Sequence, residues 1–157
     1  MAEAFALNFN VKKEIIGWDE FEVDEALIAE VTELPRTGEN WFKTTVTKDI
    51  EFRSYLKPEH KCLIWKKDIP ISFLEEKWQH LLKVILVYIT CEGKYSRVMI
   101  YHFKLMNHFT GRSPLNLPYY LHRSLTKMAH QVKAKPNKVE GRLSHQCLIK
   151  ILICELP

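Results

Sequence analysis

Apolar residues recur at three- and four-residue intervals over much of the chain after residue 24, which is the spacing of one helix face. The clearest run covers residues 73–91, and its apolar stripe consists of Leu74, Trp78, Leu81, Leu82, Ile85, Tyr88 and Ile89. Ser72 and Glu75 have capping-box spacing before this run, and Gly93 is placed to end it. The pattern therefore predicts a helix over 73–91 that turns this whole stripe, Tyr88 included, toward the core.

Three further patterns predict helices over residues 27–34, residues 94–109 and from about residue 116 to residue 132. Pro35 ends the first of them, and Pro118 is tolerated in the first turn of the last. The helix from residue 116 places one narrow apolar stripe on a single face: Leu117, Leu121, Leu125, Met128 and Val132. Each of these helices is therefore expected to bury one side only.

The segment Cys147–Cys154, CLIKILIC, is apolar nearly all round. A helix of this kind lies at the centre of a core or at an interface, and a β-strand is the competing interpretation because Ile is common in strands. The candidate residues for self-association are Leu148, Ile149, Leu152 and Ile153. The chain ends three residues after this segment, at Pro157, and we expect it to derive from a longer ancestral reading frame.

These patterns predict an all-α protein, a single domain over residues 1–157 with about five to seven helices. Residues 24–156 form the expected helical core, and residues 1–23 an N-terminal extension with a short extended segment around 5–11. Residues 57–71, which contain two prolines, are expected to form an ordered loop or an edge strand. At 157 residues and 46% hydrophobic composition, the chain can bury a core without disulfides or metal.

Charge is distributed unevenly along the chain. Residues 1–56 hold 12 acids and 6 bases, whereas residues 57–157 hold 7 acids and 17 bases. Within residues 94–142 there are 10 Lys and Arg and a single acid, Glu140. Such a basic half attracts polyanions or an acidic surface of another molecule, although a solvated surface that keeps the protein in solution is the alternative.

Signals for catalysis are weak. The chain contains no phosphate-binding glycine loop, no H-E-x-x-H and no G-x-S-x-G. His60 and Cys62 form a conceivable nucleophile pair, but with 7 His and 4 Cys such a near pair is expected by chance. The histidines after residue 100 show no i, i+4 spacing, and no Cys-x-x-Cys pair is present. We therefore expect no enzymatic activity, no cofactor and no metal site.

Nothing in the sequence indicates a membrane protein or a secreted one. The longest apolar stretch, Leu81–Cys91, is 11 residues long and is interrupted by Lys83, which is too short to span a bilayer. The first eleven residues carry Glu3 and no long apolar run, unlike a secretory signal. These features, with cysteines that form no disulfide-like framework, predict an intracellular protein in the cytoplasm or nucleus that has no membrane partner.

The basic residues of the second half form two stripes at helical spacing. On the predicted helix over 94–109, one stripe within roughly 80° of arc contains Lys94, Arg97, Tyr101, Lys104 and His108. On the next helix a second stripe contains Arg123, Lys127 and His130. Repeated positive charge with an aromatic ring is what contact with phosphates and a base requires. The alternative is the ordinary solvent face of two amphipathic helices, since Tyr101 alone supplies stacking.

Five phrases resemble the gag-like domains found in plant retroelement-derived reading frames, the plant transposon protein type. They are AEVTELP at 29–35, GENWFK at 38–43, TCEGKYSR at 90–97, LNLPYYL at 115–121 and HQCLIKI at 145–151. The similarity covers roughly residues 26–154 and implies a plant protein descended from a mobile element. The phrases match no catalytic motif, and the zinc knuckle of complete gag proteins is absent from the sequence, so the resemblance implies no functional residue.

The leading hypothesis is a non-enzymatic, retroelement-derived interaction module. It would self-associate and bind nucleic acid non-specifically through its basic helical surface. The alternative hypothesis is a host regulatory adaptor that binds another protein and makes no nucleic-acid contact. Salt distinguishes the two, because phosphate binding weakens steeply with ionic strength and a hydrophobic groove does not.

Overall fold

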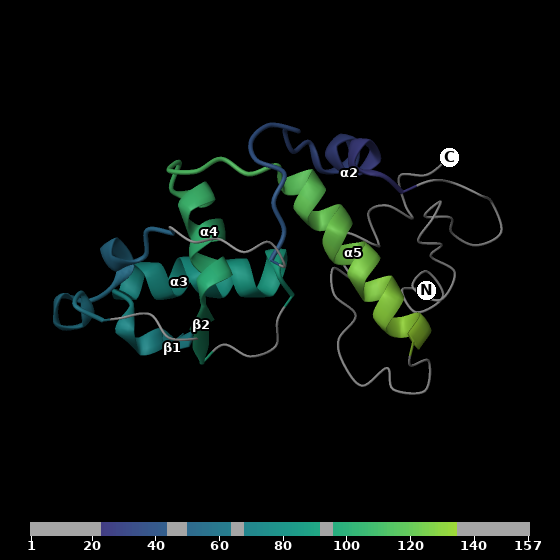
Figure 1. Ribbon diagram of the computed structural model, residues 1–157. Coiled ribbons are helices and arrows are strands. Elements are labelled where there is room, and N and C mark those ends of the chain that lie inside the picture. The colour runs from purple at the N-terminus through teal and green to yellow at the C-terminus, as the bar shows by residue number, and fades with distance from the viewer. Residues whose placement is uncertain (1–22, 44–49, 64–67, 92–95, 135–157) are drawn as a thin grey trace. The chain divides into compact units, whose positions relative to one another are not determined.

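The computed structural model describes residues 23–43, 50–63, 68–91 and 96–134. These residues divide into two compact units, each treated by itself: unit 1 contains 23–40 and 116–134, and unit 2 contains 41–115. The α-helices of the described residues are α2 (Glu25–Thr32), α3 (Glu76–Val84), α4 (Ile100–Phe109) and α5 (Leu117–Ala134), and its strands are β1 (Asp68–Pro70) and β2 (Arg97–Met99) (Figure 1). None of the helices in these ranges is both long and apolar enough to cross a membrane.

In unit 1, α2 packs against the longer α5. The acidic side chain of Asp24 caps α2 by accepting a hydrogen bond from the Leu27 backbone N–H at 2.8 Å. The helix ends at Glu33, which adopts a left-handed conformation (φ 55°) two residues before Pro35. The buried apolar residues of the unit are Val23, Ile28, Leu117, Tyr120, Leu121, Leu125, Met128 and Ala129.

The start of α5 agrees with the sequence prediction. The Asn116 side chain caps the helix by accepting from the Tyr119 N–H at 3.2 Å, and Pro118 lies in the first turn. The Asn116 amide group also donates to Glu25 Oε1 and to Asn40 Oδ1, each at 2.8 Å. This single buried side chain therefore ties the start of α5 to the start of α2 and to the segment before Trp41.

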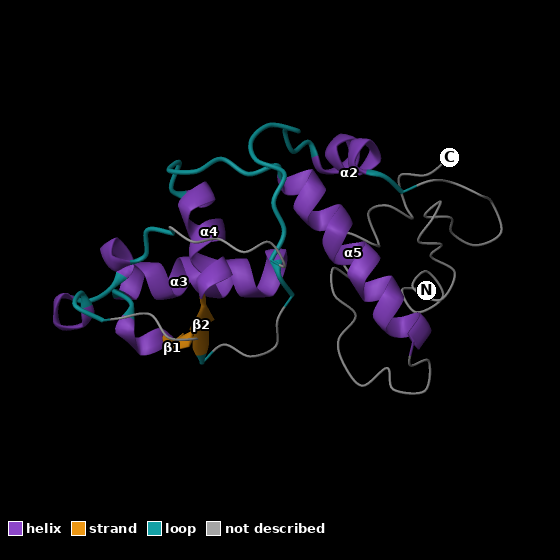
Figure 2. Cartoon of the chain, viewed as in Figure 1, coloured by secondary structure: helices purple, strands orange, loops and turns teal. Residues whose placement is uncertain are grey.

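Unit 2 contains a two-stranded antiparallel sheet beside its helices (Figure 2). The register pairs Asp68 with Met99, Ile69 with Val98 and Pro70 with Arg97. Ile69 and Val98 are buried and point into the core. Pro70 has no N–H to donate to a neighbouring strand, so it is tolerated in an edge strand such as β1. Of the two alternatives predicted for residues 57–71, a loop or an edge strand, the described residues show a strand at Asp68–Pro70, with 3-10 turns at Pro58–His60 and Ile71–Phe73.

The predicted helix over 73–91 is present but shorter and irregular. It begins at Glu76, because Ser72 belongs to a 3-10 turn and Glu75 occupies the N-cap without a side-chain bond, so the predicted capping box is wrong. After Val84 the chain widens into a π-helix over Ile85–Ile89. A hydrogen bond from the Thr90 N–H to the Ile85 carbonyl, five residues back, measures 2.9 Å and closes this wider turn.

The prediction of an all-α fold is only partly correct. The described residues are mostly helical, but they include a small sheet, and they hold four α-helices against the five to seven predicted for the whole chain. The predicted helix over 94–109 starts at Ile100, since Arg97–Met99 pairs with β1 instead. That pairing joins residues about 29 positions apart, so no local sequence pattern could reveal it. The extended segment at 5–11 and the helix over 147–154 lie outside the described residues.

Candidate nucleic-acid interface

The second basic stripe lies on α5 in unit 1. Arg123, Lys127 and His130 are all exposed, and at 100° per residue they fall within about 60° of arc. The opposite face of the same helix is buried through Leu121, Leu125 and neighbouring apolar residues. The amphipathic period that predicted this stripe therefore orients it correctly, with cations in solvent and Leu side chains in the core.

No acidic residue occurs anywhere in α5. Within the described part of the chain, Arg123, Lys127 and His130 take part in no ion pair, hydrogen bond or ring contact. Hydroxyl groups on the other side of the helix are satisfied internally, as where Thr126 Oγ1 donates to the His122 carbonyl at 2.9 Å. The stripe is consequently a row of positive charge whose donors face water.

The first basic stripe does not form as predicted. Lys94 lies outside the described residues, and Arg97 belongs to β2 instead of α4. The Arg97 guanidinium holds Asp68 at the facing strand, with Nε donating to Oδ1 at 2.7 Å and a second contact from the terminal nitrogen. Most of the positive charge of Arg97 is thus matched by a carboxylate on the neighbouring strand.

Tyr101, Lys104 and His108 do share a face of α4, and all three are half-buried. The Lys43 ammonium lies over the Tyr101 ring, 5.8 Å from its centre. His108 accepts a hydrogen bond at Nδ1 from the Leu115 N–H at 2.9 Å, and burial lowers the pKa of His108 from 6.5. His108 is therefore a neutral acceptor at neutral pH that fixes the turn after α4, and it adds no charge to a phosphate site.

Three further cations of unit 2, Arg112, Arg53 and Lys77, also make contacts within the fold. Arg112 stacks on the Tyr55 ring, with 4.9 Å from Cζ to the ring centre, and donates to the Ser54 hydroxyl. Arg53 lies over Phe52, and Lys77 lies over Trp78 while its ammonium is 3.3 Å from Glu75. These contacts direct charge toward rings and carboxylates of the same unit.

Sequence reasoning missed a buried polar network beneath these cations. The Tyr55 hydroxyl donates to Asn107 Oδ1 at 2.5 Å and lies 3.0 Å from Thr110 Oγ1, and Asn107 Nδ2 donates to the Glu51 carbonyl at 3.3 Å. These residues are about 52 positions apart or more in sequence, and only Asn107, a polar residue within an apolar run, hinted at the arrangement. The network binds the loop before α3 to α4 and is structural.

The remaining candidates carry no site that can be built from the described residues. His60 stacks on Phe73 with ring centres 3.8 Å apart, and Cys62 is an exposed free thiol. No three His, Cys, Asp or Glu side chains in the described ranges approach closely enough to hold a metal ion. The self-association candidates Leu148, Ile149, Leu152 and Ile153 lie outside those ranges.

In the described residues the fold is mostly helical, with an unpaired cationic face on α5 and a second unit in which several cations contact rings or carboxylates. No protein-family model matches the chain, and no curated protein or solved structure matches it significantly. Function must therefore be argued from the geometry of the chain itself.

Proposed function

We propose that this chain is a non-enzymatic module that binds the backbone of nucleic acid non-specifically through α5. The observation that carries the proposal is the stripe of Arg123, Lys127 and His130, exposed on a helix that contains no acid. Neutralising phosphates with Lys and Arg releases condensed counterions, and this release supplies essentially all of non-specific binding.

The geometry of the stripe suits a single strand that runs along the helix. Successive cations are about 6 Å apart along the axis for a four-residue step at 1.5 Å per residue. Arg123 can offer two donors to one phosphate, whereas Lys127 acts as a point charge. A linear electrostatic site of this kind must contact several consecutive phosphates of the strand.

Base recognition is not part of the proposal. The stripe on α5 carries no exposed Phe, Tyr or Trp, since the neighbouring Tyr119 is half-buried, and Tyr101, the ring predicted to stack on a base, belongs to unit 2 and is half-buried beneath Lys43. Without stacking or hydrogen bonds to base edges, affinity depends on charge and hardly on sequence. Weak, salt-sensitive binding with little sequence preference is the expected behaviour.

Self-association and descent from a gag-like domain of plant retroelements complete the proposal. The descent is supported by the five phrases between residues 29 and 151. A gag-derived module that binds a polyanion along one helix gains affinity from a second copy, because the second contact becomes intramolecular. The intracellular location follows from the same proposal, since that is where such a partner would be met.

The test is fluorescence anisotropy with a labelled single-stranded RNA of about 20 nucleotides, titrated at several salt concentrations. Arg123→Gln with Lys127→Gln should weaken binding at least fivefold and lower the slope of log K against log salt by about 1.4, since each phosphate contact contributes roughly 0.7. The matched control, Lys57→Gln with Lys61→Gln, removes the same charge from unit 2 and should change neither quantity appreciably. Equal losses in both variants, or no binding by the wild type, would reject α5 as the interface.

A further inference from the structure

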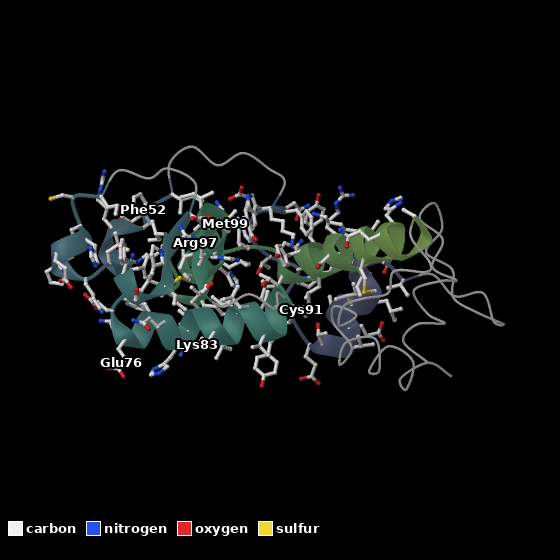
Figure 3. The ribbon with its side chains drawn as sticks, turned by 90° about the horizontal axis from the view of Figure 1, so that it is seen from below. Phe52, Glu76, Lys83, Cys91, Arg97 and Met99 are labelled. Carbon is white, nitrogen blue, oxygen red and sulfur yellow. The ribbon has the colours of Figure 1, made fainter. Side chains whose placement is uncertain are left out.

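The exposed residues of α3 and the π-helix lie on one continuous face. They are Glu76, Lys77, His80, Lys83, Val84, Val87 and Tyr88, and at helical spacing they fall within about 140° of arc. Figure 3 shows Glu76 and Lys83 along the same outer edge of α3. Leu82, Ile85 and Leu86 lie on the opposite side and are buried.

The apolar end of this face is unusual for an exposed surface. Val84, Val87 and Tyr88 are 53%, 43% and 67% exposed, and they adjoin one another at i, i+3 and i+4. Val87 and Tyr88 lie in the π turn that begins at Ile85, directly after Val84. π-Helical turns of this kind are frequent at functional sites.

The face is also polarised along its length. Its N-terminal half carries the polar side chains of His80 and Lys83, which have no partner among the described residues, while Lys77 is held by Glu75 and Trp78. Its C-terminal half carries no charge and ends in the Tyr88 ring, whose π face is electron-rich. A second copy of the same face, laid against it in the opposite direction, would bring cationic and polar groups onto the aromatic end.

We infer that a second copy of this chain docks here, with the two α3 helices antiparallel about a two-fold axis near Val84. In that register Val84 packs against its own copy, and His80 of each protomer lies opposite Tyr88 of the other, because both are four residues from the axis. Lys83 lies about 4.5 Å along the axis from the opposing Tyr88, within reach of its long side chain. The two helix dipoles then run in opposite directions.

This inference deepens the self-association in the proposed function and rests on that part of it, but not on nucleic-acid binding. One helix face makes a small interface, so we expect a weak dimer that forms at high protein concentration. Because its centre is apolar, the dimer should persist in about 1 M salt, where charge contacts are screened within roughly 3 Å. Nucleic-acid binding through α5 has the opposite salt dependence.

Sedimentation equilibrium of the full chain gives the first test. The wild type should dimerise, Tyr88→Lys should raise the dissociation constant at least tenfold, and Tyr88→Lys with His80→Asp should recover most of the loss. These two positions oppose each other only in the antiparallel register, since within one chain they are about 12 Å apart along the helix. Tyr88 is largely exposed, so circular dichroism should show an unchanged fold in both variants.

Cross-linking gives the second test. In a background in which all four native cysteines, Cys62, Cys91, Cys147 and Cys154, are changed to Ser, Val84→Cys should form a disulfide-linked dimer under mild oxidation, because the two new thiols meet at the axis. Glu59→Cys, an exposed position in the same unit, should cross-link far less. A monomeric wild type would overturn self-association altogether. A dimer that is insensitive to Tyr88→Lys and uncrosslinked at Val84→Cys would overturn this surface alone and leave self-association through another segment.

Discussion

The two units use positive charge in different ways. In unit 2, Arg97 is held by Asp68, and Arg112, Arg53, Lys77 and Lys43 lie over aromatic rings of their own unit. In unit 1, the α5 cations face water with no partner among the described residues. The contrast shows that a count of Lys and Arg does not locate a polyanion site. Such a site is expected where cations are left without internal partners.

The difference follows from what surrounds each cation. Unit 2 is rich in aromatic residues, with Tyr55, Phe103 and Trp78 packed together at 5.0–5.7 Å between ring centres. Aromatic faces at the edge of such a cluster attract nearby cations. The apolar stems of those Lys and Arg side chains then shield the rings from water. The solvent face of α5 carries no exposed Phe, Tyr or Trp and no acid, so no such group on that face competes with an external phosphate.

The largest expected effect concerns the core that orders the unit 2 cations. Ile85→Ala should cost about 2–5 kcal/mol of unfolding free energy, because Ile85 is fully buried at the start of the π-helix. Urea denaturation followed by tryptophan fluorescence measures this change. Val84→Ala, one residue earlier but exposed, is the control and should cost well under 1 kcal/mol. Equal costs would mean that the α3 helix does not bury the face described.

A smaller effect is expected in the polar network beneath Arg112. Tyr55→Phe keeps the ring contacts but removes the hydroxyl that bonds Asn107, which leaves a buried amide oxygen short of a donor. The cost should be about 1–3 kcal/mol, measured by thermal unfolding. Tyr119→Phe, which changes a half-buried hydroxyl in unit 1, serves as control. A negligible cost at Tyr55 would show that water replaces the lost bond readily.

The comparison between paired and unpaired cations can be tested directly. Arg97→Gln should lower stability by roughly 0.2–1 kcal/mol, since it breaks an exposed ion pair with Asp68, and should leave RNA binding unchanged. Arg123→Gln should do the reverse, with unchanged stability and weaker RNA binding. Parallel thermal melts and anisotropy titrations of both variants decide the matter. If Arg97 proves the more important for RNA, the stated contrast between the units is wrong.

The smallest expected effect is a pH dependence from His108. Burial lowers its pKa below 6.5, so the folded state binds fewer protons than the unfolded state in the range below that value. The stabilising contribution is therefore complete above about pH 6.5 and declines as the pH falls below it. Melting temperatures at pH 7.5 and 5.5 should differ less in His108→Gln than in wild type. An unchanged difference would show that other groups control acid stability.

Much of unit 1 could be predicted from sequence. Asp24 and Asn116 are residues that cap helices, Pro118 suits a first turn, and the spacing of Leu117, Leu121 and Leu125 sets the buried face of α5. Because the buried face was correct, the exposed Arg123, Lys127 and His130 followed automatically. These features depend on interactions within one or two helical turns, and such interactions are written in the local sequence.

Unit 2 was decided by tertiary structure. The residues of β2 look helical in isolation, yet they pair with Asp68–Pro70, and this pairing took Arg97 out of the predicted stripe and placed it beside Asp68. Tyr88, predicted to face the core, is exposed in the π turn that follows Val84. Sequence alone thus determined where α5 begins and which side of it is apolar. Which strand pairs with which, where a helix widens and which cations find partners depend on residues distant in sequence, whose proximity exists only in the folded chain.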